Sequence, residues 1–142
     1  MYGKILVAID STPESAKVLD QARGLALATD SQVHILHIQG LEVLGGLIGA
    51  AAVVEDETEQ EAGQLVKTAV DGLTAAGVTA TGSTLETPRE TIADEILAQV
   101  KEIGAGLLIL GTRRHGALAT LFVGSVSDGI VHQAPCPLLL VP

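Results

Sequence analysis

The 142-residue chain has very few aromatic residues, with one Phe, one Tyr and no Trp. Basic residues are also scarce: 8 Lys and Arg stand against 17 Asp and Glu, which gives a formal net charge of -9. Proteins that bind nucleic acid present positive charge to the phosphates, and those that bind single strands add aromatic rings for base stacking. The composition therefore argues against nucleic acid as the main partner. A small phosphate ligand is not excluded, because salt screens distant carboxylates beyond about 8 Å.

Cysteine and long apolar runs are also nearly absent. Cys136 is the single cysteine, which excludes an intramolecular disulfide and fits a reducing compartment. The apolar stretch 39–54 is interrupted by four glycines and by Glu42, so it lacks the roughly 20 continuous apolar residues of a membrane helix. The start of the chain has the pattern of a strand and not of a secretory leader. We therefore expect a cytoplasmic protein that does not bind membranes, folded as a single domain over residues 1–142.

Apolar runs of strand length alternate with helical patterns along the chain. We expect strands over residues 4–9, 32–38, 78–85, 107–110 and 137–141. Strands that are nearly continuous apolar runs, separated by helices, form parallel sheets covered on both faces. The sequence therefore predicts an α/β fold, with an open five-stranded parallel sheet and helices on both faces. We expect this Rossmann-like sheet to have the strand order 3-2-1-4-5, numbered along the chain.

Two short segments have the residue types that begin helices. Residues 11–14, Ser-Thr-Pro-Glu, offer either Thr as the cap with Pro first in the helix, or Ser and Glu as a capping box. Residues 87–90, Thr-Pro-Arg-Glu, repeat the signal before a helix expected over 88–103. The helix that begins at the first of these segments is expected to end near residue 28. Two further helices are expected over about residues 55–76 and 125–133.

Residues 111–125, G-T-R-R-H-G-A-L-A-T-L-F-V-G-S, lie between the fourth strand and the last helix. Gly111 lets the backbone turn as it leaves the buried strand, and Gly124 and Ser125 offer N–H groups and a hydroxyl at a helix start. Residues 113–114, the only adjacent pair of arginines in the chain, lie in the same segment. Backbone donors and positive charge are thus offered in one place, which predicts a phosphate site.

Three residues far apart in the sequence stand at the carboxyl ends of predicted strands. They are Asp10, Ile38 and Gly111. In open parallel sheets, ligands bind beyond these ends, at the point where the strand order reverses. We therefore expect the three residues to lie around one crevice.

Two familiar nucleotide motifs are absent. Residues 111–116 have the spacing of a Walker loop, but Ala117 and Leu118 stand where Lys and Ser or Thr would contact phosphate and magnesium. A dinucleotide fingerprint needs glycines directly after the first strand, and residues 10–15 contain none. The sequence therefore predicts neither a P-loop NTPase nor a Rossmann dehydrogenase.

Residues 111–125 resemble the phosphate-binding loop of the universal stress protein family, whose nucleotide-binding branch has G-x-x-G, nine residues and then G-[S/T]. Here Gly111 begins the pattern and Gly124-Ser125 ends it, with Arg114 in place of the second glycine. Other segments resemble further landmarks of the family: V-A-I-D-S-T at 7–12, I-L-H-I at 35–38, G-S-V-S at 124–127 and A-P-C-P-L-L-L-V at 134–141. The resemblance covers essentially the whole chain.

The resemblance implies a stress-response regulatory protein that binds an adenine nucleotide, ATP above all, with magnesium as a companion of the triphosphate. Asp10 would face the ribose and adenosine, and the backbone around Ile38 would hold the adenine edge. Arg114 would contribute a bidentate phosphate contact, unless its backbone needs a positive φ, which is unfavourable for arginine. The other implied contacts are a phosphate cradle at Gly111, Gly124, Ser125 and Val126, and strand ends at Ala8 and Leu110 that flank the base or sugar.

The same residues also have purely structural interpretations. Asp10 would cap the first helix, Gly111 would serve only the strand exit, and Ser125 would cap the last helix. Residues 113–115 would be a solvated loop. A dimeric scaffold or regulator of the same fold that binds no nucleotide is therefore the alternative function.

No catalytic or metal site is indicated. Ser125, Ser127 and His115 are close in sequence but lack an orienting acid, so no triad is recognisable. His34 and His37 lie three apart on a strand and therefore point to opposite faces. We expect a binding module and not an enzyme, with at most slow, incidental ATP hydrolysis.

Two segments bear on assembly. Residues 39–54 would form a lid over the nucleotide, a contact with another subunit, or a helical extension packed on its own sheet. The last strand, residues 137–141, is short and apolar, and at a sheet edge its backbone needs covering. The family resemblance implies pairing of this strand with a second copy. We therefore expect a homodimer through the C-terminal edge strand.

Overall fold

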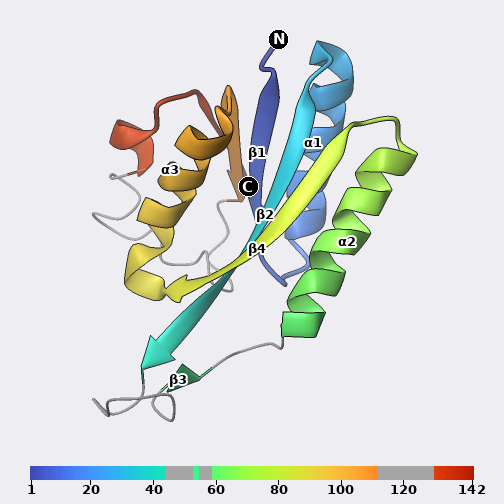
Figure 1. Cartoon of the computed structure of the whole chain (residues 1–142). Coiled ribbons are helices and arrows are strands. Elements are labelled where there is room, and N and C mark those ends of the chain that lie inside the picture. The colour runs from blue at the N-terminus through green and yellow to red at the C-terminus, as the bar shows by residue number, and fades with distance from the viewer. Residues whose placement is uncertain (44–52, 55–58, 112–129) are drawn as a thin grey trace.

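The computed structural model describes residues 1–43, 53–54, 59–111 and 130–142 (Figure 1). Its strands are β1 (Lys4–Ile9), β2 (Gln32–Val43), β3 (Val53–Val54), β4 (Ala80–Pro88), β5 (Leu107–Gly111) and β6 (Leu138–Val141). Its helices are α1 (Ser15–Thr29), α2 (Glu59–Ala75) and α3 (Ile92–Ile103), with a short 3-10 turn, η2 (Arg89–Thr91), before α3. Residues 130–133 are helical, as predicted for the end of the last helix.

Five strands form a parallel sheet in the order β4-β2-β1-β5-β6. Numbered along the predicted strands this is 3-2-1-4-5, so the predicted α/β fold and strand order are confirmed. From β1 the chain first builds the sheet towards β4, and then returns to the other side of β1 for β5 and β6. The strand order therefore reverses between β1 and β5, whose carboxyl ends flank the expected ligand position.

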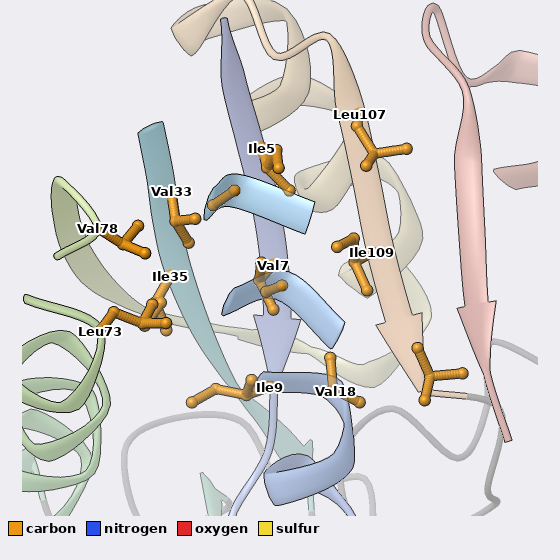
Figure 2. Packing of buried hydrophobic residues seen from close by; sticks show 13 residues of the cluster. Ile5, Val7, Ile9, Val18, Val33, Ile35, Leu73, Val78, Leu107 and Ile109 are labelled. Atoms are coloured by element: carbon orange, nitrogen blue, oxygen red, sulfur yellow. The ribbon is translucent and has the colours of Figure 1, made fainter. Parts of the chain in front are cut away.

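The two faces of the sheet carry separate buried clusters, because alternate residues of a strand point to opposite faces. Odd-numbered residues such as Val7 share a cluster with Val18 of α1 and Leu73 of α2 (Figure 2). Even-numbered residues such as Leu6 share the other cluster with Ile96 of α3. Each fully buried aliphatic side chain of this kind contributes about 1.5–3 kcal/mol to folding. α1 and α2 thus pack on one face of the sheet, and α3 packs on the other.

Where β2 pairs with β4, the predicted ends of the strands 32–38 and 78–85 are wrong, and so is the predicted start of the helix 88–103. β2 runs to Val43 and not to residue 38, and β3 pairs antiparallel with the end of β2, so residues 39–43 and 53–54 of the stretch 39–54 are strand. β4 runs to Pro88, which pairs in register with Leu41, so Pro88 ends a strand and does not begin a helix. In the described sheet β4 is an edge strand, where proline is accepted. The helix α3 begins only at Ile92.

Gly82 of β4 allows α2 to lie directly on the sheet. A Cβ atom added at this position would be 2.3 Å from Cγ1 of Val66 and 3.0 Å from Cγ2 of Val70, both on α2. Valine side chains are short and stiff, so they could not move aside without a shift of the helix. The absence of a side chain at Gly82 therefore sets the distance between α2 and β4.

Candidate functional site

The backbone turns sharply after β1, around the side chain of Asp10. The backbone N–H of Thr12 donates a hydrogen bond to Asp10 Oδ1 (2.9 Å), and the Thr12 hydroxyl donates to the same oxygen. The Ser15 hydroxyl donates to the Asp10 carbonyl oxygen (2.9 Å) and lies 3.2 Å from Oδ1. Asp10 is only 6% exposed. We name these three residues the Asp10 turn, an Asx turn that fixes a carboxylate at the carboxyl edge of the sheet.

The Asp10 turn overturns the predicted start of the first helix. α1 begins at Ser15 with Glu14 as its N-cap, and no side chain caps it. The predicted Thr12 cap is wrong, since the Thr12 hydroxyl is bonded to Asp10, and so is the predicted capping box of Ser11 and Glu14. Asp10 does not cap α1 either, because its carboxylate contacts Thr12 and the Ser15 hydroxyl. A buried carboxylate needs hydrogen-bond donors, and leaving it without them would cost more free energy than a side-chain cap on α1 would gain.

A hollow of about 340 Å³, counted with its open mouth, lies beside the Asp10 turn. Three predicted site residues, Ala8, Asp10 and Gly111, line it together. Gly111 fits closely here, since a Cβ atom would be 3.3 Å from Cγ2 of Val18. The other lining residues are Thr12, Glu14, Ser15, Val18, Val141 and Pro142. The ends of β1 and β5 thus meet at one hollow.

Several residues of this hollow are missing from the sequence prediction. Thr12 and Ser15 could have been found by asking which hydroxyl groups follow a buried Asp closely enough to satisfy it. Val141 could have been found from the strand order, because β5 and β6 are parallel neighbours and Gly111 pairs with Val141. Both signals depend on treating Asp10 as buried, which the apolar strand before it suggests.

Two predicted residues lie close to the hollow without lining it. The side chains of Ile38 and Leu110 are fully buried in the cluster under α3. Ile38 does not end its strand, since β2 continues for five residues to its end at position 43. Ile9, the last residue of β1, pairs with His37, so Ile38 is level with Asp10. These two residues could therefore contact a ligand only through their backbone groups.

The predicted residues Arg114, Gly124, Ser125 and Val126 lie outside the described residues. The whole segment 112–129 lies outside them too, as do residues 44–52 of the stretch expected to form a lid, a subunit contact or a helical extension. The described part of the site is therefore the part formed at the ends of β1, β2, β5 and β6.

Two buried polar side chains of β2, those of His37 and Gln39, lie near the level of Asp10 along the sheet. Nδ1 of His37 is 3.2 Å from the carbonyl oxygen of Ile9, and His37 is 2% exposed. A carbonyl oxygen only accepts, so Nδ1 carries the proton and donates it. Gln39, two residues further along the same face, is 4% exposed. Sequence reasoning weighed His37 only as a metal ligand and did not consider Gln39, and the available signal was polar side chains on an otherwise apolar strand face.

The described parts of the chain contain neither a candidate metal site nor a candidate membrane-spanning helix. No group of three or more His, Cys, Asp and Glu side chains there could hold a metal ion. His34 bonds to hydroxyl groups of β4, whereas His37 bonds to the backbone of β1, and the two lie on opposite faces of β2. None of the described helices combines the length and the apolar composition needed to cross a membrane.

The sequence model of the universal stress protein family matches residues 1–142. Universal stress protein YxiE from Bacillus subtilis (strain 168) is 33% identical over 150 aligned positions, which cover 99% of this chain and 99% of the relative. A crystal structure of a protein from the universal stress protein family from Burkholderia pseudomallei has a TM-score of 0.72 and 23% identity, covering 99% of this chain and 96% of that one.

The universal stress protein from Archaeoglobus fulgidus in complex with dAMP has a TM-score of 0.69 and 22% identity, covering 99% of this chain and 98% of that one. These two structural likenesses agree with the parallel sheet and its strand order. Because the family model spans the whole sequence and the Bacillus relative matches over nearly its full length, the chain belongs to the universal stress protein family.

Proposed function

We propose that the chain is a stress-response regulatory protein that binds an adenine nucleotide, ATP above all, at the carboxyl edge of the sheet. The observation that carries the proposal is the Asp10 turn beside the hollow where β1 and β5 end. Open parallel sheets bind their ligands at this position. The structure of a protein of the same family with dAMP supports an adenine nucleotide as the ligand class.

The Asp10 carboxylate is arranged to accept a hydrogen bond from a ribose. Within the described residues, its side-chain contacts of this kind are all at Oδ1: the N–H and the hydroxyl of Thr12 donate to it, and the Ser15 hydroxyl lies 3.2 Å from it. These donors hold the carboxylate in one orientation at the hollow. The second oxygen, Oδ2, would then accept from a ribose hydroxyl. A hydrogen bond to a charged group of this kind contributes about 1.5–3 kcal/mol.

In this proposal the phosphates bind where β5 ends. Their contacts would be the backbone N–H groups of Gly111, Gly124, Ser125 and Val126, the guanidinium of Arg114, and Mg²⁺ as a companion of the triphosphate. The base or sugar would lie against the backbone at Ala8, Ile38 and Leu110. The protein would act in the cytoplasm by binding the nucleotide, with at most slow, incidental hydrolysis.

Calorimetric titration of the purified protein with ATP, AMP and cyclic AMP tests the proposal. We expect saturable binding that Gly124→Val weakens, because a branched side chain would crowd the proposed phosphate contacts. Mass spectrometry of the protein as purified should detect a co-isolated adenine nucleotide. The absence of binding at millimolar nucleotide would contradict the proposal and leave the alternative, a scaffold or regulator without nucleotide.

We also propose a homodimer through β6. This strand pairs with β5 on one side, and no described strand pairs with its outer edge. Leu140 on β6 is a large apolar side chain that is 38% exposed. An apolar edge strand of this kind favours pairing with a second chain. Sedimentation at micromolar concentration should give a dimer, and a monomer there would contradict this assembly.

A further inference from the structure

An imidazole joins two hydroxyl groups on the α3 face of the sheet. His34 of β2 pairs in register with Thr81 of β4. Its Nδ1 is 2.7 Å from Oγ1 of Thr81, and its Nε2 is 3.0 Å from Oγ of Ser83. Thr81 is exposed, and His34 and Ser83 are half-buried. We name these three residues the His34 cluster.

The His34 cluster has the order of groups that activates a hydroxyl. A neutral imidazole has one N–H donor and one acceptor nitrogen. With the proton on Nδ1, His34 donates to Thr81, and its Nε2 accepts from the Ser83 hydroxyl. Burial, followed by the positive charge of Lys4, lowers the pKa of His34, so the ring is neutral at physiological pH. Thr81 thus orients a basic nitrogen towards the primary hydroxyl of Ser83, which is the arrangement of an activated nucleophile.

A second hollow opens beside this cluster, away from the proposed nucleotide site. Counted with its open mouth it has a volume of about 310 Å³, and it is lined by Lys4, Gln32, Val33, His34, Thr81 and Ile103. Leu6 pairs with His34 in register, and Asp10 lies four residues further along the chain. At the rise of a β-strand this separation is about 13 Å. A small molecule could therefore reach the His34 cluster independently of the nucleotide.

We propose that Ser83 is a nucleophilic serine that accepts an acyl group from a small activated ester or thioester. His34 is its general base, and Thr81 is a positioning residue that orients His34. In the reaction, Ser83 Oγ forms a bond to the carbonyl carbon of the donor while its proton passes to His34 Nε2. The bond from that carbon to the leaving oxygen or sulfur then breaks. The leaving atom keeps the electron pair and takes the proton from His34, and an acyl ester of Ser83 remains.

The reaction of the purified chain with p-nitrophenyl acetate tests this proposal. We expect release of p-nitrophenolate and one acetyl group on Ser83, located by peptide mass spectrometry. Hydroxylamine should remove this ester, whereas an acetyl amide on Lys4 would resist it. Ser83→Ala should abolish the ester. His34→Gln should slow its formation by about 100-fold, the contribution of a general base.

Thr84→Ala is the matched control, because Thr84 is the next residue and carries an exposed hydroxyl on the opposite face of β4. This variant should be labelled at the wild-type rate. Thr81→Val should slow the labelling, and the acetyl group should still be found on Ser83. The rate of labelling of the wild type should rise with pH around a midpoint below 6.5, because the pKa of His34 is lowered.

An acetyl group on Thr81 in place of Ser83 would overturn the proposal, and so would equal labelling of Ser83 in the wild type and His34→Gln. The position of the adduct in the wild-type protein, on Ser83 or on Thr81, tests the proposal even where a variant does not fold.

Discussion

The Asp10 turn and the His34 cluster each place two hydroxyl groups around one titratable side chain, yet they suit different chemistry. In the Asp10 turn, a short loop surrounds a carboxylate that only accepts hydrogen bonds. In the His34 cluster, two hydroxyl groups 47 and 49 positions away in the sequence surround an imidazole that donates and accepts. The first arrangement can hold the hydroxyl of a ligand, and the second can move a proton.

The two arrangements also differ in what holds them together. Local chain geometry forms the Asp10 turn, so it depends little on the rest of the sheet. The His34 cluster exists only because β4 lies beside β2 in one register, with His34 opposite Thr81. Changes that act on one of them should therefore leave the other intact.

The largest expected effect is that of Asp10→Asn on nucleotide affinity. Removing the charge should weaken ATP binding by about 10- to 100-fold, the worth of a hydrogen bond to a charged group. Calorimetry measures the change. Asp30→Asn is the matched control, because Asp30 lies at the opposite end of α1 in a left-handed conformation that asparagine also adopts. His34→Gln should leave the affinity unchanged, and a comparable loss in that variant would contradict the separation of the two arrangements.

Gly82→Ala should break the His34 cluster and spare the Asp10 turn. The new Cβ atom would collide with Val66, so α2 and β4 must move apart, at a cost of about 1–3 kcal/mol in unfolding free energy. Urea unfolding measures this cost. The rate at which p-nitrophenyl acetate labels Ser83 should also fall, because β4 has moved.

Gly24→Ala on α1 is the control, since nothing lies within 4 Å of its added Cβ atom. It should stabilise the protein by about 0.5–1 kcal/mol, because alanine favours a helix more than glycine does. Equal stability losses in the two variants would show that the contact with α2 is not the cause.

Ser15→Ala should loosen the Asp10 turn alone. The variant loses the hydrogen bond to the Asp10 carbonyl oxygen, which lowers the unfolding free energy by about 1 kcal/mol. Ser11→Ala, at an exposed position four residues earlier, should change it by less than about 0.5 kcal/mol. The same urea unfolding experiment compares the two. A loss of Ser83 labelling in Ser15→Ala would contradict the independence of the two arrangements.

The smallest effect concerns stability at mildly acid pH. Burial and the charge of Lys4 lower the pKa of His34 in the folded chain below its ordinary 6.5. Between the pKa of the folded chain and 6.5, the unfolded chain therefore binds more protons than the folded chain. The unfolding free energy should therefore fall as the pH drops through the range just below 6.5. His34→Gln should show a weaker fall in thermal or urea unfolding measured over this range. An unchanged pH dependence would mean that His34 is not shifted as described.

The sheet and part of the site could be predicted because their signals are local. Apolar runs separated by helical patterns predicted the parallel sheet, and the strand order expected for a Rossmann-like sheet is confirmed. Asp10 and Gly111 follow such runs directly, so their meeting at one hollow with Ala8 follows from the parallel arrangement. The predicted end of the third helix at residue 103 is also correct, and Gly104 follows it in the left-handed conformation typical of a helix C-terminus.

The rest depends on pairing between distant segments. Thr87 and Pro88 have the local pattern of a helix start, but pairing of β4 with the extended end of β2 keeps them in a strand. Thr12 likewise has the pattern of a helix cap, and the buried Asp10 takes its hydroxyl. The contact of His34 with Thr81 requires a register that no single stretch of sequence specifies. Tertiary contacts decide these points over local preference.

The most direct test of the proposed function is a titration with ATP monitored by the backbone amide signals of the protein in solution NMR. Saturable shifts should be largest at Asp10, Thr12 and Gly111, and they should be small at Thr81 and Ser83. Shifts that never saturate, or that are confined to residues away from the ends of β1 and β5, would contradict an adenine nucleotide site at the carboxyl edge of the sheet.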